Sequence, residues 1–278
     1  MGYPMAGHLA SARHELTVYN RTRAKADQWV KQHGGRAVAT PREAAAGADI
    51  VFSCVGNDHD LRAVALGADG VFAGMRKDAI YVDHSTVSAN VARELEKNAC
   101  EAGFQFLDAP VSGGQAGAQK GILTVMVGGN AQAFATAQPV MAHFGRAVTL
   151  MGPAGAGQLT KMVNQITIVG LVQTLAEGLN FATRAGLDAK KVIDVISKGA
   201  AQSWQLENRG PTMVDDQFDF GFATDWMRKD LQICLDEGRR NGALLPITAI
   251  IEQYYGKLQE KGHGRMDSSA LMKLLTEK

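Results

Sequence analysis

The sequence has almost no excess charge of either sign. Its 29 Lys and Arg residues stand against 28 Asp and Glu residues, which leaves a formal net charge of +1. Binding to nucleic acid or to an anionic lipid surface depends largely on excess positive charge. We therefore expect neither a nucleic-acid partner nor a membrane partner.

Cysteines and long hydrophobic runs are also scarce. The three cysteines, Cys54, Cys100 and Cys234, are odd in number and lack metal-ligand spacing, so we expect no metal site and a reducing, cytoplasmic compartment. No apolar run approaches the roughly 20 residues that span a bilayer. No charged-then-apolar signal segment opens the chain.

What remains is ordinary globular composition, with 46% hydrophobic residues in a chain of 278, long enough for two domains. The first half alternates short apolar runs with helix-like segments such as 22–33 and 88–103, which is typical of βαβ units. The sequence predicts a doubly wound parallel sheet, mixed over its last three strands. The expected strands are 16–19, 36–39, 49–55, 79–83, 104–107, 123–127 and 147–150.

The pattern changes after Gly152. A long helical periodicity runs from Gly157 to Ala185, and no convincing strand follows it. Further helices are expected at 189–198, 224–241, 246–261 and 268–275, with N-caps at Ser203, Thr224 and Ser268 and C-caps at Gly186, Gly242 and Gly262. We expect a Rossmann-like domain over residues 1–152 and an all-helical domain over residues 153–278.

The chain opens on what resembles the start of a helix, with Pro4 in its first turn. A strand that ends in Asn20-Arg21-Thr22 follows, with Asn20 eighteen residues after Gly2. In a dinucleotide-binding fold a ribose-contacting residue stands at about this distance, at the end of the second strand. Gly2 would then be the last glycine of a G-x-G-x-x-G motif. The neutral Asn20 and cationic Arg21 favour NADP over NAD, although a solvated arginine on a turn is the alternative.

Two later segments carry candidate chemistry. In Asp108–Gly114, the Ser112 hydroxyl and the N–H groups at Gly113 and Gly114 could hold a small carboxylate, unless this is an ordinary loop. Lys161 lies one turn into the long helix within an apolar segment. Asn164 and Gln165 share its helix face. Desolvation lowers the pKa of a lysine toward values useful for proton exchange, whereas most helical lysines reach to the surface.

Polar residues also follow other strands. Asn57 and Thr86 stand where ligands bind in open α/β sheets, and could meet the ribose or nicotinamide, but both residue types are also common helix caps. Lys229, at the start of a later helix, either faces a ligand-binding cleft or lies on the plain protein surface.

Together these motifs resemble the β-hydroxyacid dehydrogenase family, which includes 3-hydroxyisobutyrate dehydrogenase, tartronate semialdehyde reductase and the 6-phosphogluconate dehydrogenases. The resemblance covers essentially the whole chain. It implies a Rossmann domain and an all-helical domain joined by the lysine-bearing helix, with the active site in the cleft between them.

The resemblance also implies roles for individual residues. Lys161 would act as general acid and base, while Ser112, Gly113 and Gly114 hold the substrate carboxylate, with Asn164 and Gln165 beside them. Some members carry Asn where this chain has Gln165. The cofactor, NADP(H) in preference to NAD(H), would contact Gly2, Tyr3, Met5, Asn20, Arg21, Thr22, Val55, Gly56, Asn57, Thr86 and Lys229. Family chains begin about a dozen residues earlier, with a strand and the glycine turn. We expect a start assigned too late, or a trimmed motif.

The leading hypothesis is an NAD(P)-dependent enzyme that interconverts a short 3-hydroxy acid and its semialdehyde. The alternatives are an imine reductase, which Lys161 argues against, and a catalytically weak oligomeric binding or scaffold protein. The substrate stays open among short carboxylates. A homodimer or homotetramer is expected from the apolar second domain and from the resemblance.

Overall fold

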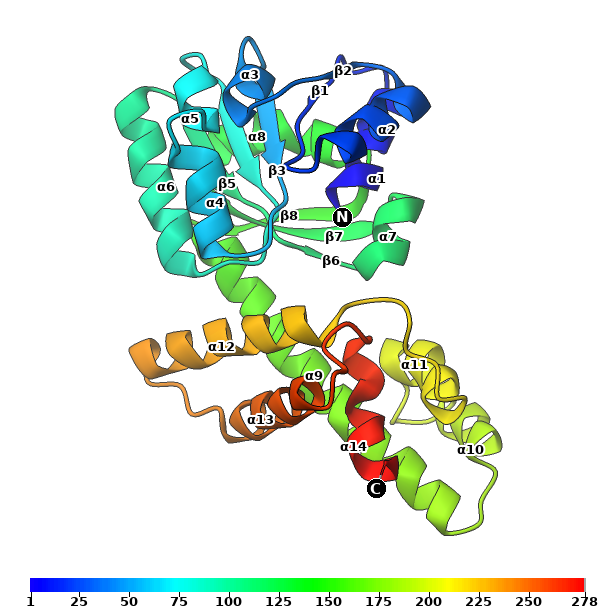
Figure 1. The fold of residues 1–278 in the computed structure, drawn as a ribbon. Helices are drawn as coiled ribbons and strands as arrows, with labels where there is room; N and C mark the ends of the chain where they lie inside the picture. Colours follow the sequence, from blue (N-terminus) through cyan, green and yellow to red (C-terminus); the bar gives the residue numbers. More distant parts are fainter. Residues whose placement is uncertain (278) are drawn as a thin grey trace. The chain divides into compact units, whose positions relative to one another are not determined.

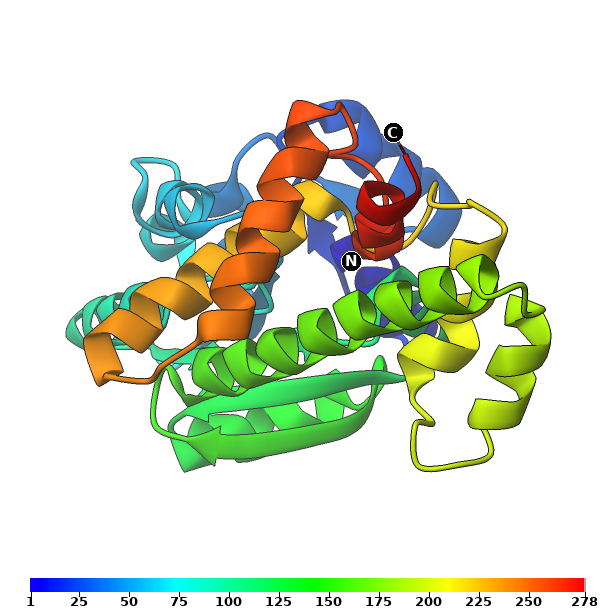
Figure 2. The same ribbon diagram turned by 90° about the horizontal axis from the view of Figure 1, so that it is seen from below.

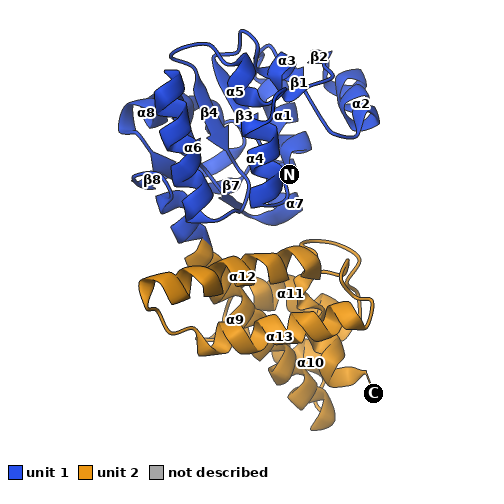
Figure 3. Ribbon diagram, turned by 60° about the vertical axis from the view of Figure 1, so that its left-hand side comes forward, with its two compact units in different colours: residues 1–161 blue, residues 162–278 orange. Residues whose placement is uncertain are grey.

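The computed structural model describes residues 1–277 of the 278 residues and divides into two compact units. Unit 1 runs from Met1 to Lys161, and unit 2 begins at Met162 (Figure 3). Each unit has its own hydrophobic core.

Unit 1 begins with a small substructure around a two-stranded sheet. Its elements are α1 (Gly2–Ser11), β1 (Thr17–Val18), α2 (Arg23–His33), β2 (Arg36–Ala37) and α3 (Pro41–Ala45). β1 and β2 are parallel, and among residues 1–277 they pair only with each other. The strands of the predicted doubly wound arrangement are thus divided between two sheets, and within residues 1–277 no strand joins β1 to the main sheet.

The main sheet has six strands and is mixed. They are β3 (Ile50–Ser53), β4 (Ile80–Asp83), β5 (Gln105–Asp108), β6 (Val111–Ser112), β7 (Leu123–Gly129) and β8 (Gly145–Gly152). β3, β4 and β5 are parallel neighbours; β7 runs antiparallel to β5 and β6, and β8 pairs parallel with β7. The mixed pairing in the last strands is confirmed, but β6 lies in the predicted carboxylate-binding segment, where the sequence predicted no strand.

Helices cover both faces of this sheet, as Figure 1 shows: α4 (Asp58–Leu66), α5 (Val71–Gly74), α6 (Ala89–Ala102), α7 (Gly114–Lys120) and α8 (Ala131–Met141). The side chains of β4 alternate between the two faces. Ile80 and Val82 join a core with residues of α1 and α8, whereas Tyr81 joins a core with residues of α4 and α6. Alternation places successive side chains of a strand on opposite faces, so a strand covered on both sides reads as continuously apolar.

The helices that follow the sheet are α9 (Ala156–Arg184), α10 (Ala189–Ile196), α11 (Trp204–Val214), α12 (Thr224–Asn241), α13 (Pro246–Glu260), a 3-10 turn at Ser268–Met272 and α14 (Lys273–Thr276). Figure 2 shows α9 extending along unit 2, with α10 and α11 at its far end. The core of unit 2 gathers buried residues from α9 to the 3-10 turn, among them Val169, Leu231 and Tyr255. The expected all-helical second half is confirmed.

The helix caps test the finer predictions. Ser203 caps α11, because its hydroxyl accepts a hydrogen bond from the Leu206 N–H at 3.1 Å. Thr224 is not a cap: it is the first residue of α12, it is buried, and its own N–H donates to the Met266 carbonyl. Ser268 is also not the cap, since the preceding Asp267 accepts from the Ser269 N–H.

α9 also bears on the expectation that no segment could span a bilayer. By length and composition alone the helix meets the criterion for a membrane-crossing helix, with a mean hydropathy of 1.2 over an 18-residue window. That expectation is therefore not confirmed. Core helices of soluble proteins meet the same criterion, so one such helix is weak support for a membrane location.

Candidate active site

The N-terminus of the helix that carries Lys161 is capped by a carboxylate at the end of a strand. Asp108 ends β5, and its carboxylate accepts hydrogen bonds from the Gly155 N–H at 2.7 Å and the Gln158 N–H at 2.9 Å, at the start of α9. Burial raises the pKa of Asp108, while the backbone donors oppose that shift. Lys161 lies one turn beyond Gln158 and is 7% exposed. The cap therefore fixes the part of α9 that bears the predicted catalytic lysine.

The Gln158 side chain ties the same turn to the segment that follows β4. Its Nε2 donates to the Ser85 carbonyl at 2.8 Å, and its Oε1 accepts from the Val87 N–H at 3.1 Å. These two bonds flank Thr86, one of the predicted cofactor-binding residues. Sequence reasoning missed Gln158, because a glutamine in the first turn of a helix carries no signal of a partner some 70 residues away.

The predicted carboxylate-binding segment, Asp108–Gly114, begins at this same aspartate. Ser112 lies in β6, paired with Thr124 of β7. Gly113 and Gly114 have positive φ values of 126° and 61°, which glycine adopts without steric cost. A Cβ on Gly114 would meet no other atom within 4 Å. The backbone at Gly114 is thus open to approach, and its role in binding stays a prediction.

Three further predicted residues meet in unit 2 around Asp230, which is 1% exposed. Asn164 donates to the Gln165 side-chain oxygen at 2.8 Å, and Gln165 donates to the Asp230 carboxylate at 2.6 Å. The Lys229 ammonium lies 2.9 Å from the other oxygen of Asp230. Gln165 thus serves to hold Asp230 and Asn164. The adjacent Lys229-Asp230 pair in the sequence gave only a weak signal of this cluster.

The residues predicted to meet the adenosine end of a dinucleotide lie around α1 and β1. Asn20 accepts a hydrogen bond from the Thr22 N–H at 2.9 Å, which shapes the turn after β1. The Arg21 side chain is 87% exposed and reaches Asp60 at 3.7 Å, a separation at which an exposed ion pair contributes little. Arg21 is therefore available to another anion.

Tyr3 and Met5 differ in exposure. The Tyr3 hydroxyl donates to Gln32 at 2.9 Å. Met5 is 4% exposed and belongs to the core of unit 1. A contact between Met5 and the cofactor stays a prediction.

The end of β3 supplies the remaining predicted positions, Val55, Gly56 and Asn57. The Val55 N–H donates to the Ser85 hydroxyl at 2.8 Å, which joins the ends of β3 and β4. Asn57 caps α4 by accepting from the Asp60 N–H at 2.8 Å. The cap that the sequence offered as an alternative for Asn57 is thus present.

The donor groups in unit 1 fit a dinucleotide with phosphate groups. α1 has no acidic residue in its first turn, and no side chain among the described residues caps its N-terminus. Its first N–H groups, at the positive end of the helix dipole, suit an anion. A Cβ on Gly2 would lie 3.6 Å from the Cβ of Cys54, directly after β3. The helix start and the strand end are thus close together, as a phosphate cradle requires.

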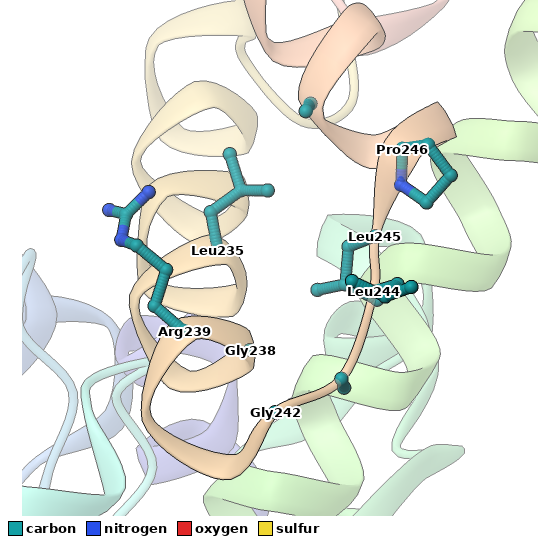
Figure 4. A pocket seen from close by; sticks show the side chains of 9 residues that line it. Leu235, Gly238, Arg239, Gly242, Leu244, Leu245 and Pro246 are labelled. Carbon is teal, nitrogen blue, oxygen red and sulfur yellow. The ribbon is translucent and has the colours of Figure 1, made fainter.

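A separate hollow lies in unit 2, between the end of α12 and the start of α13 (Figure 4). It encloses about 530 Å³ and is lined mainly by apolar residues such as Leu235, Leu244, Leu245 and Pro246. Of the residues that the structure describes, Arg239 is the one charged residue that lines it. None of the predicted site residues lines it, and we assign it no chemistry.

Comparisons with known proteins support the same class. Residues 1–152 match the model for the NAD binding domain of 6-phosphogluconate dehydrogenase, and residues 155–275 match that for NAD-binding of NADP-dependent 3-hydroxyisobutyrate dehydrogenase. A protein of Shewanella frigidimarina named only as an oxidoreductase is 60% identical over 98% of this chain and 94% of its own length. The 2-hydroxy-3-oxopropionate reductase of Escherichia coli is 34% identical, over 99% of this chain and 94% of its own length.

A solved structure agrees over nearly all of the chain. The Mycobacterium tuberculosis 3-hydroxyisobutyrate dehydrogenase, solved with L-serine, superposes with a TM-score of 0.89 at 30% identity, covering 99% of this chain and 95% of that one. Fold and comparisons together define an oxidoreductase that uses a nicotinamide dinucleotide. The chain belongs to the β-hydroxyacid dehydrogenase family.

Proposed function

We propose that the protein interconverts a short 3-hydroxy acid and its semialdehyde, with NADP(H) as the preferred cofactor and Lys161 as general acid and base. The observation that carries the proposal is the placement of Lys161. It is 7% exposed and lies just beyond a helix start that is capped by Asp108, the first residue of the predicted carboxylate-binding segment. Hydrogen bonds thus connect the helix of the proposed proton donor to the proposed anion-binding segment.

The reaction uses these residues in the following way. Ser112 and the N–H groups at Gly113 and Gly114 hold the carboxylate, which sets the position of the carbonyl group. A nicotinamide, when bound, would supply the hydride for reduction and accept it in oxidation. As the carbonyl carbon gains the hydride, the carbonyl oxygen takes a proton from the Lys161 ammonium, and the lysine regains that proton from solvent. Oxidation reverses each transfer.

The neighbouring polar residues take supporting roles. Asn164, one turn further along α9, orients the substrate hydroxyl, and its link through Gln165 to buried Asp230 fixes its side chain. Lys229 contacts the cofactor, as the family resemblance implies. Arg21 favours the 2′-phosphate of NADP, because its exposed guanidinium can form forked bonds to a phosphate.

A screen of NADPH and NADH oxidation against short semialdehydes tests the function. The panel includes 2-hydroxy-3-oxopropionate and methylmalonate semialdehyde, and L-serine is tested in the oxidative direction, because relatives are named for or solved with such compounds. Lys161→Ala should abolish turnover and leave cofactor affinity nearly unchanged. Full activity of that variant would refute the assignment. No fluorescence change with either cofactor would instead favour a binding or scaffold protein.

We propose also that the protein forms a homodimer through the outer face of α9. This face carries Val163, Leu171 and Phe181, which are 64%, 40% and 72% exposed. Thr167 and Thr174 lie on the same face, and their hydroxyls donate to Val163 and Gly170 carbonyls within the helix. The face is therefore apolar and satisfied in its own hydrogen bonds, over roughly 27 Å of helix at 1.5 Å per residue.

The order of side chains supports a second copy as the partner. If two copies of α9 pack antiparallel about a two-fold axis near Val172, Val163 lies opposite Phe181 and Leu171 opposite Thr174 of the partner. Thr167 then lies opposite Gly178, where a Cβ would meet no atom of its own chain within 4 Å. Each exposed apolar side chain thus meets an apolar or a small one, as a self-complementary interface requires.

Sedimentation analysis tests this interface. Phe181→Glu should convert the dimer to a monomer, because each new carboxylate would be buried against an apolar side chain of the other copy with no partner for its charge. Val195→Glu, at a 71% exposed site on α10, is the matched control and should leave the dimer intact. A monomeric wild-type protein at micromolar concentration would contradict the proposal.

A further inference from the structure

The strongest connection outside the predicted catalytic set is the buried network that joins three separate segments of unit 1. Asp108 and Gln158 are both fully buried, at 0% exposure. Asp108 links the end of β5 to the first turn of α9, and Gln158 links that turn to the segment after β4. Each of these segments carries or adjoins residues to which the proposed function gives a role.

We propose that Asp108 and Gln158 are positioning residues that fix Lys161 relative to β6, which carries Ser112, and to the backbone around Thr86. This inference rests on the proposed function, because it assigns the two residues to the geometry of the same reaction. Neither residue needs to touch substrate or cofactor. Both act through the backbone of α9, whose next turn carries Lys161.

The hydrogen bonds explain why these two side chains suit the task. The Asp108 carboxylate accepts from N–H groups that a helix start leaves without intrahelical partners, and one negative charge there is favourable to the helix dipole. The Gln158 amide makes one donated and one accepted bond to the backbone on either side of Thr86. A carboxylate at 158 could accept from Val87 but would repel the Ser85 carbonyl. An apolar side chain would make neither bond.

Two glycines permit the close approach that the network needs. A Cβ on Gly157 would collide with the Met126 carbonyl oxygen and approach the Asp108 carboxylate to 2.8 Å. A Cβ on Gly128 would collide with the Asp108 carboxylate and approach the Gly157 nitrogen to 2.8 Å. The start of α9 therefore lies directly on β7 and the end of β5. Small changes in this contact would be transmitted to Lys161.

The expected effect of breaking the network is on the rate of the chemical step. Displacement of a catalytic group by about 1 Å can cost about 100-fold in rate. Gln158→Met should therefore lower kcat by about 10- to 100-fold, with the KM values for cofactor and aldehyde changed by less than about threefold. Gln158→Glu should show the same loss at pH 8 and recover activity as the pH falls, because a protonated glutamic acid can again donate to Ser85 and accept from Val87. Gln158→Met should not recover.

A second measurement needs no catalysis. In Gln158→Met without ligand, amide hydrogen exchange should rise at least tenfold at three backbone positions: Val87, Gly155 and position 158 itself. Exchange in β7 should be unchanged. Gln173→Met is the matched control: it removes another buried glutamine of α9, which donates only to Glu177 among the described residues. It should leave both kcat and the exchange of the capped turn as in the wild type.

The outcomes separate the two proposals. An active wild type, with slow Gln158→Met, acid recovery of Gln158→Glu and raised exchange at the capped turn, supports positioning. An active wild type with Gln158→Met within twofold of its kcat overturns the positioning role and leaves the proposed function standing. Unchanged exchange in Gln158→Met also overturns it. A wild type that binds cofactor but reduces no semialdehyde overturns the proposed function, and the positioning of a catalytic lysine with it.

Discussion

The buried His84 provides a prediction whose size and sign follow from the structure. It directly follows β4 and is 2% exposed. Its ring stacks on Phe52, with centroids 5.6 Å apart, and meets the edge of Phe144 at 5.4 Å. Its Nδ1 lies 2.6 Å from the Ala109 carbonyl oxygen, and its Nε2 has no hydrogen-bond partner among residues 1–277. His84→Phe keeps the shape and the aromatic contacts and removes the titrating group.

Burial lowers the pKa of His84 from 6.5 to about 4. Between these values the unfolded chain binds the proton and the folded chain does not, so the wild type loses stability as the pH falls. A pKa lowered from 6.5 to about 4 corresponds to at most about 3.5 kcal/mol of stability, at about 1.4 kcal/mol per pKa unit. Phenylalanine cannot bind a proton. The free energy of unfolding of His84→Phe, relative to the wild type, should therefore increase by up to about 3 kcal/mol between pH 7 and pH 4.

Asp83 gives a reference of opposite sign. Burial raises its pKa from 3.8 to about 6. The folded chain then binds the proton first, and the wild type loses stability as the pH rises through this range. Asp83→Asn removes this term and can still accept the hydrogen bonds that the Ser53 and Ser85 hydroxyls donate. Relative to the wild type, this variant should become less stable as the pH falls from 7 to 4.

Urea unfolding measured at the fluorescence of Trp29 tests both variants. Trp29 is buried in unit 1, whereas Trp204 and Trp226 belong to unit 2. Both unit 2 tryptophans are therefore substituted by Phe in the wild-type background and in both variants, so that the fluorescence reports on Trp29 alone. Opposite slopes of the two relative stabilities between pH 4 and pH 7 are the expected result. Parallel slopes, or a His84→Phe difference that does not vary with pH, would show that His84 is not held neutral by burial.

Three further predictions concern other parts of the chain. Arg21→Ala should raise the KM for NADPH about tenfold and that for NADH less than twofold, because a charge-assisted hydrogen bond contributes about 1.5 kcal/mol. Initial rates with both cofactors measure this, and equal effects on the two KM values would refute the phosphate role. Ser203→Ala should lower the free energy of unfolding of unit 2 by about 1 kcal/mol, because the α11 cap is lost. Urea unfolding followed by the fluorescence of Trp226 measures this, and an unchanged free energy would contradict the cap. Gly157→Ala should lower the melting temperature by several degrees, because its Cβ would clash with the Met126 carbonyl and overpacking typically costs about 2 kcal/mol. Calorimetry measures this shift, and an unchanged melting temperature would contradict the close contact.

Much of the fold follows from local patterns in the sequence. α12 begins and ends where the periodicity predicts, at Thr224 and Asn241, and α9 differs from its expected range by one residue at each end. Such helices are visible because their apolar residues repeat at three- and four-residue steps. β6 was missed because it has only two residues, Val111 and Ser112, after a proline. A strand this short shows no alternation, and its pairing with β7 decides its conformation.

The site shows the same division between residue type and partner. Asp83 and Asp108 are register neighbours at the ends of adjacent parallel strands, and the sequence places both correctly at strand ends. Their partners differ: Asp83 accepts from two hydroxyls in unit 1, whereas Asp108 accepts from the backbone at the start of α9. The second partner lies 47 to 50 positions along the chain, beyond any local pattern. A strand-end aspartate predicts an acceptor, and only the folded chain decides that one of the two caps the helix that carries Lys161.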